Sequence, residues 1–164
     1  MKRLCSLPLA GWLAVIVLAG LAAPALSAPE GLVVQAQLIW GTNDPQSPDP
    51  KHRDIGPELS AKLKASAFRW KNYFEVKRHV ASIPTNETKT LIMSDLCKVE
   101  IKSLGGDMVE IKLFGEGKPL ATRKEKLAVD WPLIMAGDAK NDTAWMVVIR
   151  KAAPNAKLET VRAN

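Results

Sequence analysis

Alternation of apolar and polar residues is the dominant pattern of this chain beyond about residue 30. In 96–103, for example, Cys97, Val99 and Ile101 alternate with lysine and glutamate. A period of two is typical of a β-strand with one buried face. We expect strands over 33–40, 73–83, 88–93, 96–103, 108–114, 120–127, 129–135 and 143–151.

The composition of three of these segments predicts their place in a sheet. Segment 120–127 is polar on both faces and segment 129–135 contains Pro132, and both features are typical of edge strands. Segment 143–151 is apolar on both faces, so we expect it in the centre of a sheet.

The alternation of apolar and polar residues gives way once to a helical spacing, at Pro57. Leu59 and Leu63 follow at helical spacing, which predicts one amphipathic helix over about 57–68. The preceding segment, 41–56, contains three prolines and is predicted to be a loop. The fold class expected is mainly β, an antiparallel β-sandwich or partly open barrel of about seven strands with one short α-helix.

The turn around Gly105 can be predicted at the level of strand register. A two-residue turn would place glutamates in the apolar stripe of the hairpin. A three-residue loop, 105–107, pairs Ile101 with Ile111 and Val99 with Leu113. Apolar residues then share one face of the hairpin, and opposite charges meet on the other. We therefore expect the second register.

The N-terminal segment, 1–28, resembles a secretory signal peptide. Lys2 and Arg3 precede a segment without charge, and small residues follow its apolar core. We expect cleavage near 25–28 and an exported protein, periplasmic or secreted. The alternative is an uncleaved single-pass anchor, since the apolar segment is just long enough to span a membrane. The remainder divides into one domain, 29–151, and a polar tail, 152–164.

Removal of segment 1–28 changes the charge and the cysteine count. The net charge falls from +6 to +4, because Lys2 and Arg3 are lost and no acid is. Cys97 is then the only cysteine, so one chain can form no internal disulfide. Apolar burial must hold the domain together. The largest contributors expected are Trp40, Trp70, Trp131 and Trp145.

No residue pattern points to catalysis or to a cofactor. Cys97 shares its strand face with apolar residues, which predicts an inert core thiol. His52 and His79 have no zinc-ligand spacing with it, and G-x-S-x-G and phosphate-binding loops are missing from the sequence. We assign no catalytic residue, metal site or cofactor. The alternative is an enzyme acting on envelope glycans through an unrecognised pair of carboxylates.

The interval 62–78 contains six basic residues against the single acid Glu75, which is expected on a solvated strand face. The interval predicts a binding surface for an anionic partner, either an envelope polyanion or an acidic protein surface, with no nucleic acid expected. A solvated surface without a partner is the alternative. The function expected is a non-catalytic extracytoplasmic binding or structural domain. The predicted binding residues are Lys62, Lys64, Arg69, Lys71, Lys77 and Arg78.

Several short motifs resemble those of small exported bacterial proteins of unassigned function. They are apolar anchors and turns, so the resemblance implies a fold and no activity. The motifs are Gly41-Thr42-Asn43-Asp44, the segment 68–74, Cys97, Leu113-Phe114-Gly115, and Ala136-Gly137-Asp138 leading to Thr143-Ala144-Trp145.

Overall fold

The computed structural model describes residues 31–66, 68, 70–137, 143–153 and 156–157. The predicted signal peptide, Arg69 and most of the polar tail lie outside these ranges. Within them the chain forms nine strands and one helix. The elements are β1 (Leu32–Thr42), β2 (Arg53–Asp54), α1 (Pro57–Ala65), β3 (Asn72–Ile83), β4 (Thr88–Ile92), β5 (Cys97–Gly105), β6 (Met108–Gly115), β7 (Lys118–Lys126), β8 (Leu133–Gly137) and β9 (Ala144–Lys151).

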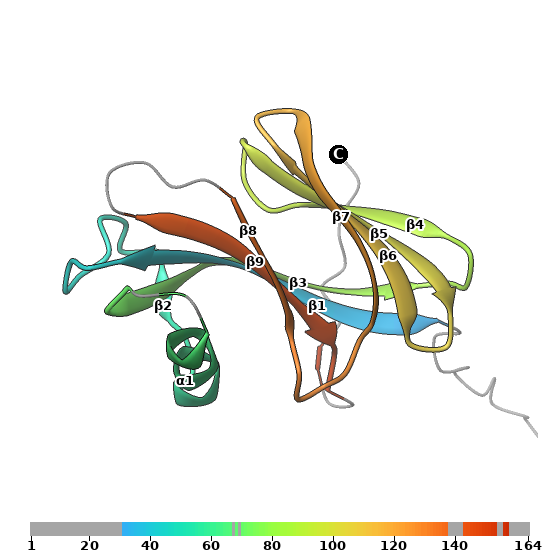
Figure 1. The fold of residues 1–164 in the computed structure, drawn as a ribbon, viewed down its shortest axis with the longest axis horizontal. Coiled ribbons are helices and arrows are strands. Elements are labelled where there is room, and N and C mark those ends of the chain that lie inside the picture. The colour runs from blue at the N-terminus through green and yellow to red at the C-terminus, as the bar shows by residue number, and fades with distance from the viewer. Residues whose placement is uncertain (1–30, 67, 69, 138–142, 154–155, 158–164) are drawn as a thin grey trace, which may run out of the picture.

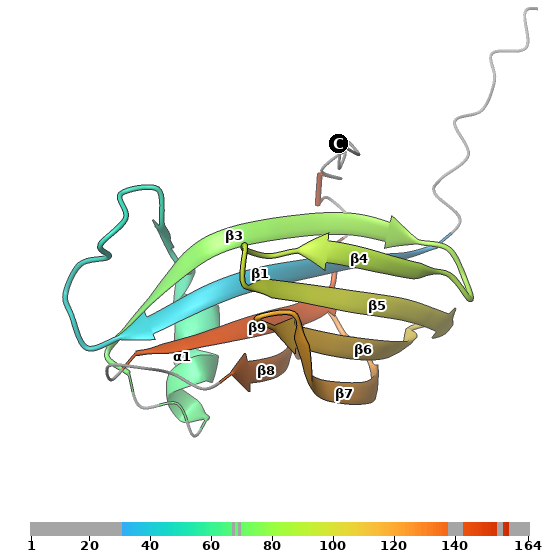
Figure 2. The same cartoon turned by 90° about the horizontal axis from the view of Figure 1, so that it is seen from above.

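The strands form two antiparallel sheets that pack face to face (Figures 1 and 2). Sheet A has the order β2-β3-β1-β9-β8, and sheet B has the order β4-β5-β6-β7. The described strands close no barrel, so the predicted mainly-β sandwich is confirmed. The predicted positions of three strands are also confirmed, because β7 and β8 are edge strands and β9 is central.

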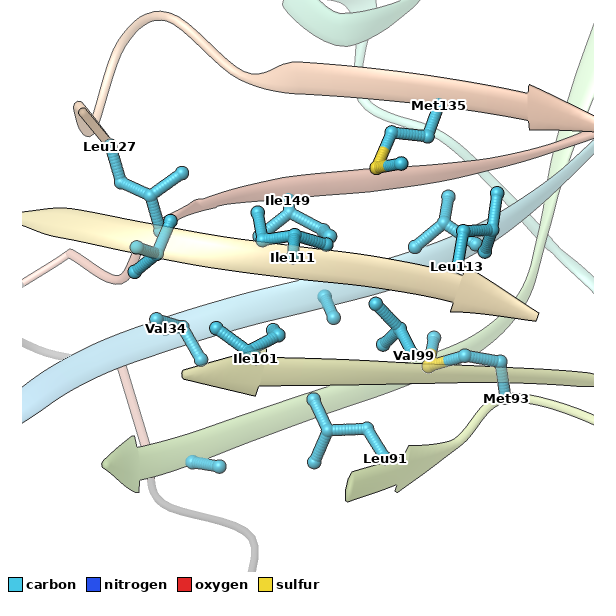
Figure 3. Packing of buried hydrophobic residues seen from close by; sticks show 14 of the residues in the cluster. Val34, Leu91, Met93, Val99, Ile101, Ile111, Leu113, Leu127, Met135 and Ile149 are labelled. Carbon is cyan, nitrogen blue, oxygen red and sulfur yellow. The ribbon is translucent and has the colours of Figure 1, made fainter. Parts of the chain in front are cut away.

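The main core lies between the two sheets (Figure 3). Ile101 and Ile111 of sheet B pack toward Val34 and Ile149 of sheet A, and all four side chains are fully buried. Burial of one such side chain contributes about 1.5–3 kcal/mol. This layer, repeated along the strands, holds the two sheets together.

The β5–β6 hairpin has the predicted register. Ile101 lies opposite Ile111, and Val99 lies opposite Leu113. The turn itself differs from the predicted loop 105–107: Gly105 pairs with Met108, which leaves a two-residue turn at 106–107, and a bulge between Ser103 and Gly105 takes up the extra residue. Gly105 has a φ of 101°, a conformation that glycine adopts without strain.

Helix α1 covers the other face of sheet A, away from sheet B (Figure 1). Leu59 and Leu63 pack there on apolar residues of β1 and β9. The helix ends at Ala65, before the predicted end at 68. Ser66 adopts an extended conformation, and its hydroxyl donates to the Lys62 carbonyl over 2.8 Å, which closes the last turn. No helix of the described ranges is long and apolar enough to cross a membrane.

Two expectations about single residues are wrong. Trp131 is 79% exposed, because it precedes Pro132 in the connection between β7 and β8 and lies outside both cores. Glu75, expected on a solvated strand face, is only 5% exposed. A bulge in the β1–β3 pairing, opposite Ile39, turns Glu75 toward the face that α1 covers.

Candidate functional site

A cavity opens between the sheets, at the end where sheet A extends beyond sheet B. In Figures 1 and 2, β1, β3 and β9 project past the strands of sheet B at this end. The cavity has a volume of about 540 Å³, which is within the range of small-molecule sites. The lining residues from the two sheets include Leu38, Trp40, Val76 and Trp145 of sheet A, and Cys97 and Gly115 of sheet B. We call this cavity the cleft.

Two tryptophans form the wall that sheet A contributes to the cleft. Trp40 and Trp145 are paired residues on β1 and β9, so their side chains share one face. Both are partly buried, although each carries a large apolar surface. The ring of Phe74 lies 6.2 Å from that of Trp40 and supports it. The wall is therefore aromatic and partly exposed to the cleft.

Gly115 lies in the opposite wall of the cleft, where its lack of a side chain leaves space. A Cβ at this position would lie 2.7 Å from Leu120 Cδ1 and 3.5 Å from Trp145 Cζ2. A side chain here would therefore occupy the cleft. The rim is apolar as well, because Leu96 and Leu120 are 63% and 49% exposed. Exposed leucines on the border of a concave apolar surface indicate a surface that a ligand or partner covers.

Cys97 lies in the floor of the cleft and is 5% exposed. Burial raises the pKa of its thiol to about 11, because the apolar surroundings disfavour the thiolate. A catalytic cysteine needs the opposite shift, produced by a neighbouring positive charge. Cys97 is therefore a buried core residue, as the strand pattern predicted.

Three polar side chains, His52, Ser94 and Glu116, line the cleft. His52, from the proline-containing loop, is fixed by Ser47, whose Oγ lies 2.7 Å from His52 Nδ1, and its ring centre lies 6.3 Å from that of Trp40. Glu116 is exposed, and no described residue bonds to its carboxylate. The cleft can therefore accept a hydrogen-bond donor from a ligand whose apolar part enters it.

Glu116 also has an unusual backbone conformation. It occupies the first position of the two-residue turn between β6 and β7, with a φ of 51°, and Gly117 follows with a φ of 77°. This turn type favours Asn-Gly or Gly-Gly, and a glutamate in the left-handed region costs roughly 1 kcal/mol. Strained residues of this kind are concentrated at functional sites.

The structure separates the predicted basic residues. Lys62 and Arg78 line a second cavity, of about 360 Å³, between α1 and sheet A. Lys64 and Lys71 are exposed elsewhere, and Lys77 lies on the opposite face of β3 from Arg78, since neighbouring strand residues alternate. Lys77 and Arg78 therefore do not share a surface, and Arg69 lies outside the described residues.

Arg78 is part of a buried polar network. Its Nη2 donates to Glu75 Oε2 over 2.6 Å, and its Nε lies 3.1 Å from both carboxylate oxygens. Gln37 donates to the same carboxylate and accepts a 2.8 Å hydrogen bond from Gln35. Arg78 thus neutralises a buried acid, which is a structural role. The sequence gives no sign of this role, because it depends on the bulge in the β1–β3 pairing.

Two arrangements bear on catalytic and metal chemistry among the described residues: a pair of carboxylates in one cavity and a cluster of metal ligands. Each of the four cavities is lined by a single carboxylate, whereas glycoside hydrolysis uses two. No group of three His, Cys, Asp or Glu side chains in the described ranges could hold a metal ion.

Sequence reasoning missed the cleft, although it named several of the residues that line it, Trp40, His52, Cys97 and Trp145 among them. Trp40 and Trp145 were expected to be core residues, and only their large size marked them as unusual. Glu116 could have been noticed as the wrong residue type for a tight hairpin turn. Comparison of the chain with protein-family models, with curated proteins and with solved structures finds no match.

Proposed function

We propose that this protein is a non-catalytic extracytoplasmic binding domain that takes the apolar part of a small amphipathic ligand into the cleft. The observation that supports the proposal is the concave apolar surface of about 540 Å³ between Trp40, Trp145 and Gly115, with three polar side chains among its lining residues. An apolar floor with a few polar groups is the usual design of a ligand site. The extracytoplasmic location rests on the signal-like segment 1–28.

A small ligand fits this site better than a protein segment does. The cleft is enclosed by both sheets and by Pro48 and His52 of the loop, so it receives a ring or a short chain rather than a flat surface. The unpartnered carboxylate of Glu116 suits a ligand with a hydroxyl or amine group beside its apolar part.

The test uses anilinonaphthalene sulfonate, a fluorescent apolar probe, with the full chain. We expect saturable binding at one site and slower maleimide labelling of Cys97 when the probe is bound, with Cys97 distinguished from Cys5 by peptide mass mapping. Gly115→Val should abolish binding by filling the cleft. Gly56→Val adds the same side chain in open space, where no atom lies within 4 Å of the added Cβ, and should leave binding unchanged.

A second variant guards against misfolding of Gly115→Val. Leu96→Asn changes a 63% exposed rim residue at little cost to the core and should weaken binding several-fold. If the probe binds Gly115→Val and Leu96→Asn as well as the unchanged protein, or leaves Cys97 labelling unaltered, the cleft is not the binding site.

A further inference from the structure

The positive charge of the described residues is concentrated on sheet B. Its four strands contain eight basic and three acidic side chains, a net charge of +5. The remaining described residues contain ten basic and ten acidic side chains, so their net charge is zero. The predicted basic interval 62–78 lies outside sheet B, among described residues whose charges sum to zero.

The outward face of sheet B, which we call the lysine face, holds five of these eight basic side chains. Residues paired across strands share a face, and Lys102, Glu110 and Lys124 form one such row across β5, β6 and β7. A second row joins Glu100, Lys112 and Thr122. The lysines of the face are Lys98, Lys102, Lys112, Lys124 and Lys126, and its acids are Glu100 and Glu110.

Both acids of the lysine face are already neutralised. Lys98 lies 3.1 Å from Glu100, and Glu110 lies 3.7 Å from Lys112 and 3.4 Å from Lys124. Lys102 and Lys126 are exposed and have no carboxylate partner among the described residues. The face thus keeps an excess of three positive charges, and no helix or strand of the described chain covers it.

We propose that the lysine face binds a linear acidic polysaccharide. The lysines are spread over the outward surface of a sheet, where a single exposed charge pair binds weakly. A polymer whose acidic groups recur along its length can engage several lysines at once, and the linked contacts together give measurable affinity. The face spans four strands about 4.8 Å apart, enough for several sugar units.

The other groups on the face favour a sugar polymer over an anionic membrane. Thr88, Thr90 and Thr122 expose hydroxyls among the lysines, and these can exchange hydrogen bonds with sugar hydroxyls. The exposed apolar side chains of Ile92 and Met108 lie at opposite ends of the face. The face therefore lacks the continuous apolar surface that inserts into a bilayer, and charge alone would have to hold it on an anionic membrane.

The experiment compares alginate, a linear polyuronate, with uncharged dextran and with anionic phospholipid vesicles, in titrations of the full chain. We expect binding to alginate that weakens steeply with added salt, and none to dextran. Lys102→Gln, Lys124→Gln and Lys126→Gln together should weaken binding roughly tenfold or more, because three of the linked contacts are lost.

The matched control is Lys64→Gln, Lys71→Gln and Lys77→Gln together, which removes the same charge from exposed positions outside the lysine face. It should leave alginate affinity within about twofold. Acetylation footprinting of the unchanged protein gives a second readout, in which alginate should protect Lys102, Lys124 and Lys126.

Three results would overturn the proposal. The control triple could weaken binding as much as the lysine-face triple, which would show that net charge alone decides. Alginate could leave the three lysines unprotected. The vesicles could bind while alginate does not, which would indicate a lipid surface. Gly115→Val leaves the lysines intact, so this variant should still bind alginate whether or not the cleft binds its ligand. The two proposals can therefore fail separately.

Discussion

Replacement of Arg78 tests whether the buried network on sheet A stabilises the domain. The Glu75 side chain is 6% exposed, whereas the Arg78 side chain is 45% exposed. Arg78→Gln would leave a carboxylate buried with only the Gln37 amide to compensate it. Breaking a fully buried ion pair costs about 3–5 kcal/mol. Because water reaches the guanidinium side here, we expect about 2 kcal/mol.

Urea unfolding followed by tryptophan fluorescence measures this loss. With a denaturant slope of about 2 kcal/mol/M, a loss of about 2 kcal/mol lowers the midpoint by about 1 M. Lys64→Gln is the control, since Lys64 is exposed and unpaired in the described structure, and its midpoint should stay within about 0.3 M.

The double variant isolates the interaction between the two side chains. Glu75→Gln added to Arg78→Gln removes the buried charge, so the double variant should be more stable than Arg78→Gln alone. If Arg78→Gln unfolds at the same urea concentration as Lys64→Gln, the network does not stabilise the fold. Arg78 would then be the solvated basic residue that the sequence suggested.

Two further predictions concern single residues of the cleft. Burial alone raises the Cys97 pKa from 9.0 to about 11, so the folded state keeps the thiol proton at pH values where the unfolded chain loses it. The free energy of unfolding should be unchanged below about pH 9 and fall as the pH rises through 11. Maleimide should label Cys97 of the folded protein at pH 7.5 about 100-fold more slowly than Cys97 of the urea-unfolded chain. Equal labelling rates in the two states would contradict this. Glu116→Asn should raise the free energy of unfolding by about 0.5–1 kcal/mol, because asparagine tolerates the left-handed conformation of the turn; a lower midpoint in urea would show that the turn is not strained.

The features predicted correctly from the sequence depend on residues close together in the chain. The register of the β5–β6 hairpin follows from two requirements within the hairpin itself, that apolar residues share a face and that opposite charges meet. The edge positions of β7 and β8 follow from their own composition. Glu75 was misplaced because its orientation depends on a bulge in the pairing with β1, a strand that lies beyond the 41–56 loop and α1 in the sequence.

The distribution of charge was misread for a related reason. In 62–78 the basic residues are neighbours in sequence, but the helix and the alternation of β3 send them to different surfaces. On β5 and β6 the lysines alternate mainly with apolar residues, so the linear pattern there shows only ordinary strands. Their concentration becomes visible when four strands are placed side by side. The cleft was missed in the same way, since Trp40, Cys97 and Trp145 are far apart in the sequence and belong to three different strands.

The cleft and the lysine face use opposite faces of the same strands, and this makes the two proposals separable. Along β6, Phe114 pairs with Lys98 on the outward face, where the Lys98 ammonium lies 4.2 Å from its ring. The next residue, Gly115, faces inward beneath Trp145. A substitution at Gly115 therefore alters the cleft and leaves the outward lysines in place, whereas Lys124→Gln does the reverse. A variant that changed both binding activities would indicate that the strand itself had been disturbed rather than either surface.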